Sequence, residues 1–484
     1  MTRTEVIKTR HPIGLAVLFL TEMWERFSYY GMRAILVYFM MKYLLFSHDR
    51  ASMIYGLYTS LAYLTTLIGG WVADFYLGQR KTVFAGGVLM AIGQFVLAYG
   101  ATLPQDTAAA TASGLIGSPA EIFFVLGLFF LVIGSGLFKP NISTQVKALY
   151  PPNDARVDSA FSIFYVGINV GAFFSPLVCG TLGEKFGWKY GFLAAGIGIT
   201  IGLIIYVLGG RYLEEDHLTK EKQQQTADKI KRQTLAQIFT CNKNEQAAIL
   251  AIVILALFNV VNWAVYEQQG NVMAVWFDEC TDRHIFTWLA SLFPHTTNPF
   301  LLKLMSFEMP ATWFQSVNPF MIFSFTPVLV WFWAKQAAKK TEPTTITKLG
   351  MGCIMFGVSY VFMLIACHER ATSAAHLASV WWPILSTVVL TIGELYLSPV
   401  GLSFVTKVAP ARLLSTLMGV WFLSSFGGNF FSGFIGSYWQ KWGDLPFFSL
   451  MGILPILAGI GIFALRGFLE RTSALAQEEK KSVE

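Results

Sequence analysis

Two carboxylates and a guanidinium stand inside an apolar stretch that runs from about residue 13 to 41. Glu22 and Arg26 are four residues apart and Glu25 adjoins them, so a helix groups their side chains. Arg33, seven residues beyond Arg26, returns to nearly the same face. A charge inside a membrane helix costs roughly 2.5 to 3.5 kcal/mol and ordinarily faces water or a partner charge. The pattern therefore predicts a membrane-spanning helix that borders a transport pathway.

Three more ionisable side chains lie deep in apolar stretches, namely Lys139, Glu267 and Glu394. Left unpaired, all seven charges would cost about 20 kcal/mol, which exceeds the net stability of an ordinary protein. They must therefore pair, be hydrated or be protonated. One interpretation is that they form ion pairs that only lock helices together, although apolar packing would do so at a lower desolvation cost.

The types of these charges fit a substrate that carries both signs. Arg26 and Lys139, in the first half of the chain, can hold a carboxylate, and arginine can do so through two hydrogen bonds. Glu394, together with Glu267, can hold an ammonium group in the second half. A bound zwitterion would then bridge the two halves.

Glu22 and Glu25 also offer a way to couple substrate to protons. A carboxyl group in a desolvated cavity keeps its proton more readily, whereas an adjacent arginine favours the carboxylate. Movement of Arg26 would therefore change the protonation of its neighbours, although many transporters carry such carboxylates.

Apolar runs long enough to span a bilayer supply the helices that position these residues. The twelve runs cover about 13–41, 53–78, 82–101, 120–146, 158–182, 189–210, 246–277, 312–336, 347–367, 379–406, 413–438 and 446–467. A polar stretch at 211–245 divides them six and six. We expect an all-α membrane protein with an N-terminal bundle (1–210), a cytoplasmic linker (211–245) and a C-terminal bundle with its tail (246–484). The linker is either an amphipathic helix on the membrane surface or a solvated tether.

The composition supports an integral membrane protein. The chain of 484 residues is 54% hydrophobic and only 13% charged, below the roughly 25% of soluble domains. Lys and Arg outside the spans favour one side by about three to one, which predicts cytoplasmic N- and C-termini. The net charge of +6 thus reflects membrane topology, and no nucleic-acid partner is expected.

Other classes of chemistry have no support in the sequence. The five cysteines are scattered without metal-binding or disulfide spacing. No nucleophile constellation, metal cluster or phosphate loop is present, so we expect neither an enzyme nor a cofactor other than protons as the coupling ion. The first apolar stretch is too long and too charged for a signal peptide. The outer stretch at 279–311 is interpreted as a surface loop, with a short amphipathic helix near 285–293 as the alternative.

The motif Glu22-x-x-Glu25-Arg26-Phe27-x-Tyr29-Tyr30 resembles the helix 1 signature of the proton-dependent oligopeptide transporter family, within the major facilitator superfamily. Further segments resemble the family in order along the chain: Gly70-x-x-x-Asp74-x-x-x-Gly78-x-Arg80-Lys81, Phe138-Lys139-Pro140-Asn141, Phe164-Tyr165-x-x-Ile168-Asn169-x-Gly171, Trp263-x-x-x-Glu267-Gln268, Gln315-x-x-Asn318-Pro319, Gly393-Glu394-x-x-x-Ser398-Pro399 and Met418-Gly419-x-Trp421-Phe422. The polar linker leaves no room for the two extra helices that many bacterial members of the family carry there.

The resemblance implies a role for each matching residue. The expected proton-coupling residues are Glu22, Glu25, Arg26 and Glu267, and the last would pair with Arg33 between the bundles. The expected substrate-binding residues are Arg26 and Lys139 for the peptide carboxylate, Asn169, Asn318 and Glu394 for the amino terminus, and Tyr29, Tyr30, Arg33, Tyr63, Trp263 and Trp421 around the pocket. Tyr63 rests on its position in helix 2 alone. For Tyr29, Tyr30 and the two tryptophans, a packing or membrane-interface role is an equally good interpretation. Arg33 could instead extend to the membrane surface.

The sequence therefore predicts a twelve-helix major facilitator transporter that imports di- and tripeptides together with protons, functional as a monomer in the plasma (bacterial inner) membrane. One alternative is a proton-coupled porter of another small anionic or zwitterionic solute, such as nitrate or a peptide-like drug. Another is a membrane receptor or scaffold that transports nothing.

Overall fold

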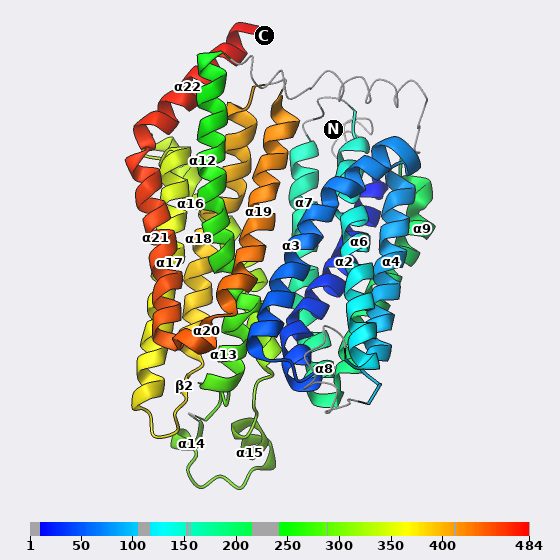
Figure 1. Cartoon of the computed structure of the whole chain (residues 1–484), viewed down its shortest axis with the longest axis vertical. Coiled ribbons are helices and arrows are strands. Elements are labelled where there is room, and N and C mark those ends of the chain that lie inside the picture. The colour runs from blue at the N-terminus through cyan, green and yellow to red at the C-terminus, as the bar shows by residue number, and fades with distance from the viewer. Residues whose placement is uncertain are drawn as a thin grey trace. The chain divides into compact units, whose positions relative to one another are not determined.

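The computed structural model describes residues 10–104, 117–151, 154, 156–214, 242–287, 289–410 and 413–483 (Figure 1). Packing divides the chain into two compact units, one of Met1–Leu45 with Leu61–Thr234 and one of Phe46–Ser60 with Leu235–Glu484. The predicted linker at 211–245 lies mostly outside the described residues. Its form, and the predicted division at 1–210, 211–245 and 246–484, stay predictions.

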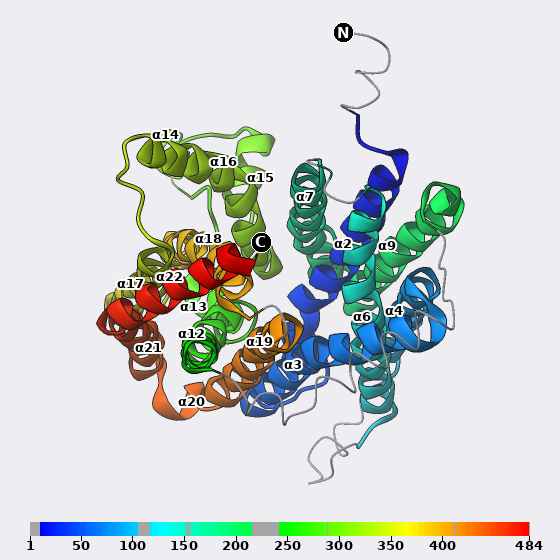
Figure 2. The ribbon, with the colours of Figure 1, turned by 90° about the horizontal axis from the view of Figure 1, so that it is seen from above.

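The first unit consists of helices that follow one another with short connections. They are α2 (Ile13–Tyr38) with its π-helical extension η1 (Phe39–Tyr43), the later part of α3 (His48–Val72) with η2 (Ala73–Leu77), α4 (Gln79–Gly100), α6 (Pro119–Ala148), α7 (Val157–Ser175), η3 (Pro176–Gly180), α8 (Thr181–Phe186), α9 (Trp188–Leu208) and η4 (Gly209–Tyr212). Helix α2 packs against α7 and α9, and α4 packs against α6 and α9 (Figure 2). Helix α2, which carries the charged stripe, therefore lies inside this unit.

Small residues allow α4 and α6 to approach closely. A Cβ atom added to Gly86 would lie 2.7 Å from the Gly134 carbonyl oxygen, and one added to Gly93 would lie 2.9 Å from that of Gly127. Membrane helices commonly associate through such small residues because their backbones can then touch. The close pairing fixes the position of α6, the helix that carries Lys139.

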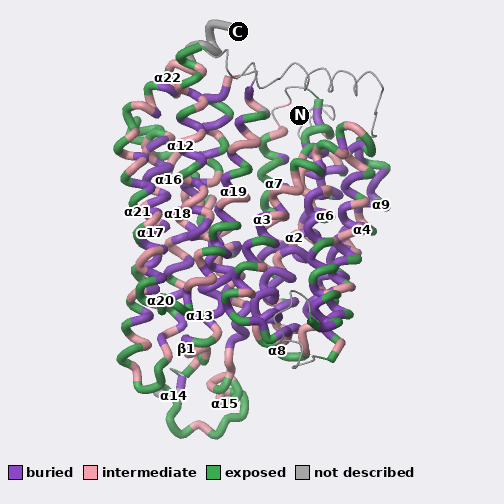
Figure 3. The backbone as a smooth tube through the Cα atoms, in the orientation of Figure 1, coloured by how far each residue is buried: buried purple, intermediate pink, exposed green. Residues whose placement is uncertain are grey.

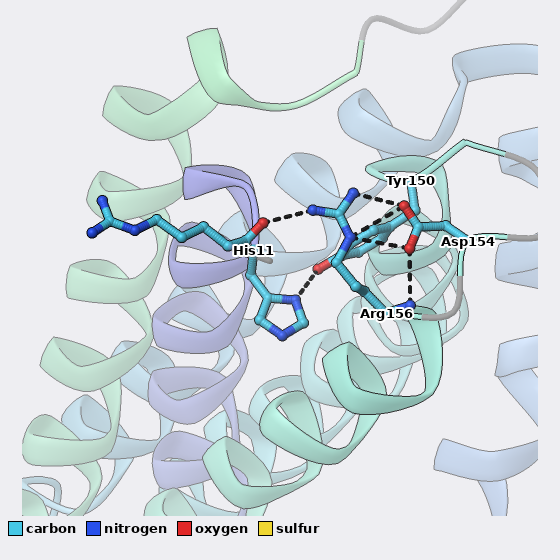
Figure 4. Close-up of polar contacts among 5 residues, drawn as sticks. His11, Tyr150, Asp154 and Arg156 are labelled. Atoms are coloured by element: carbon cyan, nitrogen blue, oxygen red, sulfur yellow. Dashed lines mark hydrogen bonds and ion pairs between the residues drawn. The ribbon is translucent and has the colours of Figure 1, made fainter. Parts of the chain in front are cut away.

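Polar contacts attach the start of α2 to the connection between α6 and α7 (Figure 4). His11 Nδ1 lies 2.7 Å from the Tyr150 hydroxyl, and Arg156 donates to the Arg10 carbonyl oxygen at 2.6 Å. Arg156 also pairs with Asp154 at 2.6 Å. Hydrogen bonds from Arg156 lower the pKa of the Asp154 carboxyl group to about 2. Asp154 therefore stays ionised at any physiological pH, and Arg156 is held in place beneath the entry to α2.

The second unit holds the remaining long helices and the outer connections. Its elements are the early part of α3, α12 (Lys243–Tyr266), η5 (Glu267–Gly270), α13 (Val272–Cys280), β1 (Thr281–Asp282), α14 (Leu289–Leu292), α15 (Pro299–Met305), η6 (Ala311–Ser316), α16 (Val317–Ala338), α17 (Thr345–Thr372), β2 (Ala378–Ser379), α18 (Trp381–Val408), α19 (Leu414–Gly436), α20 (Trp439–Trp442), α21 (Asp444–Ala464) and α22 (Arg466–Val483). Helix α17 packs against both α18 and α21, and α12 packs against α19 (Figure 2).

The outer stretch at 279–311 contains more structure than a plain loop. Strands β1 and β2 form a short parallel pair, in which Thr281 lies opposite Ala378. Helix α15 has no buried residue and is green and pink in Figure 3. The sequence missed the strand pair because a two-residue strand leaves no alternating pattern.

The early part of α3 packs closely within the second unit. Asn271 donates to the Ser52 hydroxyl at 2.7 Å, and Ser52 donates to the Gly433 carbonyl oxygen at 3.1 Å. A Cβ atom on Gly56 would lie 2.5 Å from the Cα atom of Gly433. Glycine at both positions is what permits this contact between α3 and α19.

Ten helices in the described part of the chain are long and apolar enough to cross a membrane. The two other long helices in the predicted spans are α2, of 26 residues, and α19, of 23 residues. Helix α2 is less hydrophobic because it carries the stripe of Glu22, Glu25, Arg26 and Arg33. The arrangement is consistent with the twelve predicted spans.

Candidate substrate and proton-coupling site

Two glutamates share one arginine on α2. Arg26 Nε donates to Glu22 Oε1 at 2.6 Å and lies 3.2 Å from Glu25 Oε2. Both carboxyl groups are buried, with side chains 1% and 0% exposed. Glu22 receives a hydrogen bond, whereas neither oxygen of Glu25 accepts one from the described residues. The cluster would carry a net negative charge if both acids were ionised, and one added proton would neutralise it.

Lys139 of α6 faces two tyrosines. Its Nζ lies 3.8 Å from the centre of the Tyr29 ring and 5.5 Å from that of the Tyr63 ring. Contact with a ring face stabilises an ammonium group by about 0.5 to 2 kcal/mol, depending on desolvation. The rings leave the charge of Lys139 uncancelled, so it can still attract an anion.

Tyr29 and Tyr30 form an edge-to-face pair with ring centres 5.2 Å apart. Arg33 lies over the Tyr30 ring at 5.8 Å. The first unit thus brings Arg33, Tyr30, Tyr29, Lys139 and Tyr63 into one continuous chain of contacts. Tyr63, which was predicted from its position alone, is part of this chain of contacts.

Asn169 of α7 is buried, and its amide donates to the carbonyl oxygen of Tyr165 in the same helix at 2.9 Å. Two residues later, about half a turn along the helix, a Cβ atom on Gly171 would lie 3.1 Å from the Cβ atom of Arg26. Helix α7 therefore approaches the charged part of α2 closely. Asn169 itself contacts only its own helix in these bonds, and its role in binding stays a prediction.

A second cluster lies in the other unit. The Asn318 amide of α16 donates to Glu394 Oε2 at 2.8 Å and to the Thr391 hydroxyl at 2.9 Å. Tyr266 donates to Asn318 Oδ1 at 3.3 Å. Residues of two other helices, α12 and α18, therefore hold Asn318 in one orientation, and Asn318 in turn orients the Glu394 carboxylate.

Aromatic residues border the Glu394 carboxylate. Trp263 and Tyr266 line a small cavity together with Glu394 and Ser398. The two rings form an edge-to-face pair with centres 5.1 Å apart. The predicted residue Trp421 is buried and lines the adjoining cavity with Asn259 and Asn262, against Gly401 of α18.

Sequence reasoning missed Thr391, Tyr266, Asn259 and Asn262. A signal for them exists, because Thr391 and Tyr266 stand three residues from Glu394 and Trp263, on the same helix faces. The two asparagines are polar residues inside a strongly apolar helix. Asn259 donates to Ser424 at 2.7 Å and Asn262 to the Cys353 sulfur at 3.0 Å, which ties α12 to α19 and α17.

Glu267 is buried at the end of α12, where Tyr55 of α3 donates to its Oε2 at 3.3 Å. Sequence reasoning missed Tyr55, which no motif singles out. The predicted partner Arg33 belongs to the other unit, so the ion pair between Glu267 and Arg33 stays a prediction.

Comparison with known proteins agrees with these features. The model of the POT family matches residues 80–231 and 299–444. The chain is 32% identical to a di-/tripeptide transporter of Lactococcus lactis subsp. cremoris, over 96% of this chain and 97% of that protein. It is also 32% identical to a peptide transporter of Yersinia enterocolitica, over 88% of each.

Solved structures share the fold. The crystal structure of peptide transporter POT in complex with sulfate superposes with a TM-score of 0.79 at 29% identity and covers 96% of each chain. A POT family transporter in complex with 5-aminolevulinic acid superposes with a TM-score of 0.78, also at 29% identity, covering 95% of this chain and 97% of that one.

The protein is accordingly a multi-pass membrane transporter with the major facilitator fold, as the sequence predicted. Within that class, the chain belongs to the POT family. The predicted family is confirmed.

Proposed function

We propose that this protein imports di- and tripeptides together with protons by alternating access. The hydrogen bond from Asn318 to Glu394 carries the proposal, because it fixes a carboxylate beside the aromatic residues Trp263 and Tyr266. Such a carboxylate suits a peptide ammonium group. The relatives that match most of the chain include a di-/tripeptide transporter and a peptide transporter, which supports peptides as the substrate.

The first unit supplies the complementary charge. Arg26 and Lys139 would take the peptide carboxylate, by charge-assisted hydrogen bonds that are stronger than neutral ones. The remaining predicted residues would surround the peptide: Tyr29, Tyr30, Arg33, Tyr63, Asn169, Trp263 and Trp421. A substrate with opposite charges at its two ends is the ligand that needs both sets.

The cluster of Glu22, Glu25 and Arg26 would couple protons to peptide. Two buried acids on one guanidinium leave a net negative charge, and a buried charge without hydrogen bonds is costly. Glu25, whose oxygens accept no hydrogen bond from the described residues, is our candidate for the coupling proton. Protonation of the cluster frees Arg26 to bind the peptide carboxylate.

In the proposed cycle, proton and peptide bind from the outside and are released to the cytoplasm. Loss of the proton restores the attraction between Arg26 and its glutamates, which weakens peptide binding. Glu267 and Arg33 would pair as part of the same cycle. A membrane potential contributes about 2.3 kcal/mol for each charge moved across 100 mV.

Several accompanying features belong to the same proposal. Both termini would be cytoplasmic, in the plasma (bacterial inner) membrane, in accordance with the distribution of Lys and Arg. Protons would be the coupling ion, with no cofactor and no enzymatic reaction. One copy of the chain would suffice for transport.

A second candidate is a porter of another small zwitterion. The POT family transporter solved with 5-aminolevulinic acid favours it, since that ligand also has an amino group and a carboxylate. The charges of Glu394 and Arg26 suit both kinds of solute.

Uptake by purified protein in liposomes tests the proposal. With an acidic exterior and a negative interior, labelled dialanine should accumulate, and a protonophore or unlabelled dipeptide should abolish the accumulation. Uptake of 5-aminolevulinic acid without uptake of dialanine would favour the second candidate. If the folded protein takes up neither dialanine nor 5-aminolevulinic acid, the proposal is contradicted.

A further inference from the structure

A separate polar cavity of about 410 Å³ lies within the second unit, where α16 ends, α17 begins and α18 ends. Its lining includes Trp333, Glu342, Lys348, Ser403 and Lys407. None of these residues belongs to the candidate peptide site. The distribution of positive charges predicts that this end of the helices faces the cytoplasm.

Lys348 is a buried base in this cavity. Its side chain is 10% exposed, its Nζ lies 2.5 Å from Glu342 Oε1, and the same atom lies 4.1 Å from the centre of the Trp333 ring. A buried ammonium group requires a compensating anion. Lys348 therefore requires an anion beside its ammonium group, and the Glu342 carboxylate occupies that position.

Glu342 can move away from this position more easily than Lys348 can. Its side chain is 38% exposed, and it stands in the loop between α16 and α17. Its carboxylate can turn into water at little cost, whereas the Lys348 ammonium cannot follow it. An anionic ligand could thus replace Glu342 without leaving a buried charge unpaired.

Further donors surround this position. The Trp333 indole Nε1 is buried and has no hydrogen-bond partner among the described residues. An unsatisfied buried donor is costly, and a ligand oxygen that accepted from it would remove that cost. Lys407 adds a second base, and the first turn of the 28-residue helix α17 borders the cavity with the positive end of its dipole.

The chemistry of these donors selects the ligand. They approach from three helices, so a group with several acceptor oxygens can satisfy more of them than a carboxylate can. A phosphate group has such oxygens and a charge that two lysines can balance. The cavity has room for it together with an attached headgroup.

We propose that this cavity binds a phosphate group, which displaces Glu342 from Lys348 and accepts from Trp333 and Lys407. The source is either the headgroup of an anionic lipid or a soluble phosphate. The inference does not depend on the transported substrate, since the cavity is separate from the residues proposed to bind peptide.

Thermal unfolding of the purified full chain tests the inference in two settings. In detergent, inorganic phosphate is titrated against chloride at constant ionic strength. In nanodiscs, phosphatidylcholine alone is compared with phosphatidylcholine that contains phosphatidylglycerol. We expect a saturable rise in the unfolding midpoint with inorganic phosphate, with phosphatidylglycerol or with both. A rise with inorganic phosphate shows that soluble phosphate is sufficient. A rise with phosphatidylglycerol alone identifies the lipid headgroup as the source of the phosphate.

Variants show whether the effect arises in this cavity. Lys348→Gln and Lys407→Gln should each weaken the response at least tenfold in the concentration required. Glu342→Gln should strengthen it several-fold, because the competing carboxylate is removed. Lys339→Gln is the matched control, since it removes the same charge from the same end of α16 outside the cavity, and it should change nothing.

The Glu342→Gln result keeps the test decisive if Lys348→Gln fails to fold. No saturable response in either setting would overturn the proposal. An equal response in the Lys407→Gln and Lys339→Gln variants, with none of the gain expected for Glu342→Gln, would do so as well.

Discussion

The Asn318 amide donates to Glu394 Oε2 at 2.8 Å, and the same amide donates to Thr391 at 2.9 Å. From α16, the Asn318 amide therefore bridges two residues that lie one turn apart on α18. This contact holds the carboxylate of Glu394 in a defined direction. A carboxylate that is oriented by a fixed amide presents its negative charge to an ammonium group in a defined direction.

Glu394→Gln should weaken dialanine binding by roughly ten- to a hundredfold, because a hydrogen bond to a charged group contributes about 1.5 to 3 kcal/mol. Asn318→Leu should weaken binding less, since the carboxylate remains but loses its orientation. Isothermal titration calorimetry on the detergent-solubilised protein measures both. Glu308→Gln, a like change in the outer connection next to Arg283, serves as the control. Unchanged affinity in Glu394→Gln would remove this residue from the site.

Replacement of either glutamate next to Arg26 should separate transport from the proton gradient. Glu22→Gln and Glu25→Gln should each abolish accumulation of labelled dialanine while exchange of internal for external peptide continues. Glu25→Gln should retain more exchange, because glutamine mimics the protonated form of Glu25, our candidate for the coupling proton. Parallel assays of accumulation and counterflow provide the measurement. Equal loss of both activities in each variant would argue against a specific coupling role.

Lys139 is predicted to recognise the peptide carboxylate. Lys139→Gln should weaken binding of dialanine by at least tenfold but leave binding of dialanine amide nearly unchanged, because the amide has no carboxylate to lose. Tyr29→Phe keeps the ring face 3.8 Å from Nζ and should have little effect. Competition against a labelled dipeptide measures all four combinations. An equal loss for both ligands would point to a structural role for Lys139.

The attachment of the α2 entry in Figure 4 should persist at low pH. Since Arg156 lowers the pKa of Asp154 to about 2, below its value in an unfolded chain, the carboxylate stabilises the folded state above about pH 4. This contribution is lost only as the pH falls through about 2. Hydrogen exchange at residues 10–15, corrected for intrinsic rates, should show equal protection at pH 7 and pH 5. Asp154→Asn should reduce it at both, whereas protection in the wild-type protein that declines by pH 5 would contradict the assignment.

How much the sequence could predict depends on how local each feature is. The helices and the charged stripe follow from apolar run length and from i,i+4 spacing, and the contact between Arg26 and Glu22 was predictable for that reason. The role of Tyr63 could be inferred only from position, and the structure places it beside Lys139. Tyr55 and Thr391 were missed because their contacts with Glu267 and Asn318 join helices far apart in the chain. The burial of Lys348 against Trp333 and Glu342 likewise depends on packing that no motif records.

The most direct test of peptide and proton symport is the pH inside liposomes that contain the purified protein and a trapped pH-sensitive dye. With no initial pH gradient and the membrane potential clamped at zero by potassium and valinomycin, dialanine added outside should acidify the interior. The wild-type protein should do so at a rate that saturates with peptide, and Glu25→Gln should not. Uptake of labelled dialanine with no acidification by the wild-type protein would contradict proton coupling.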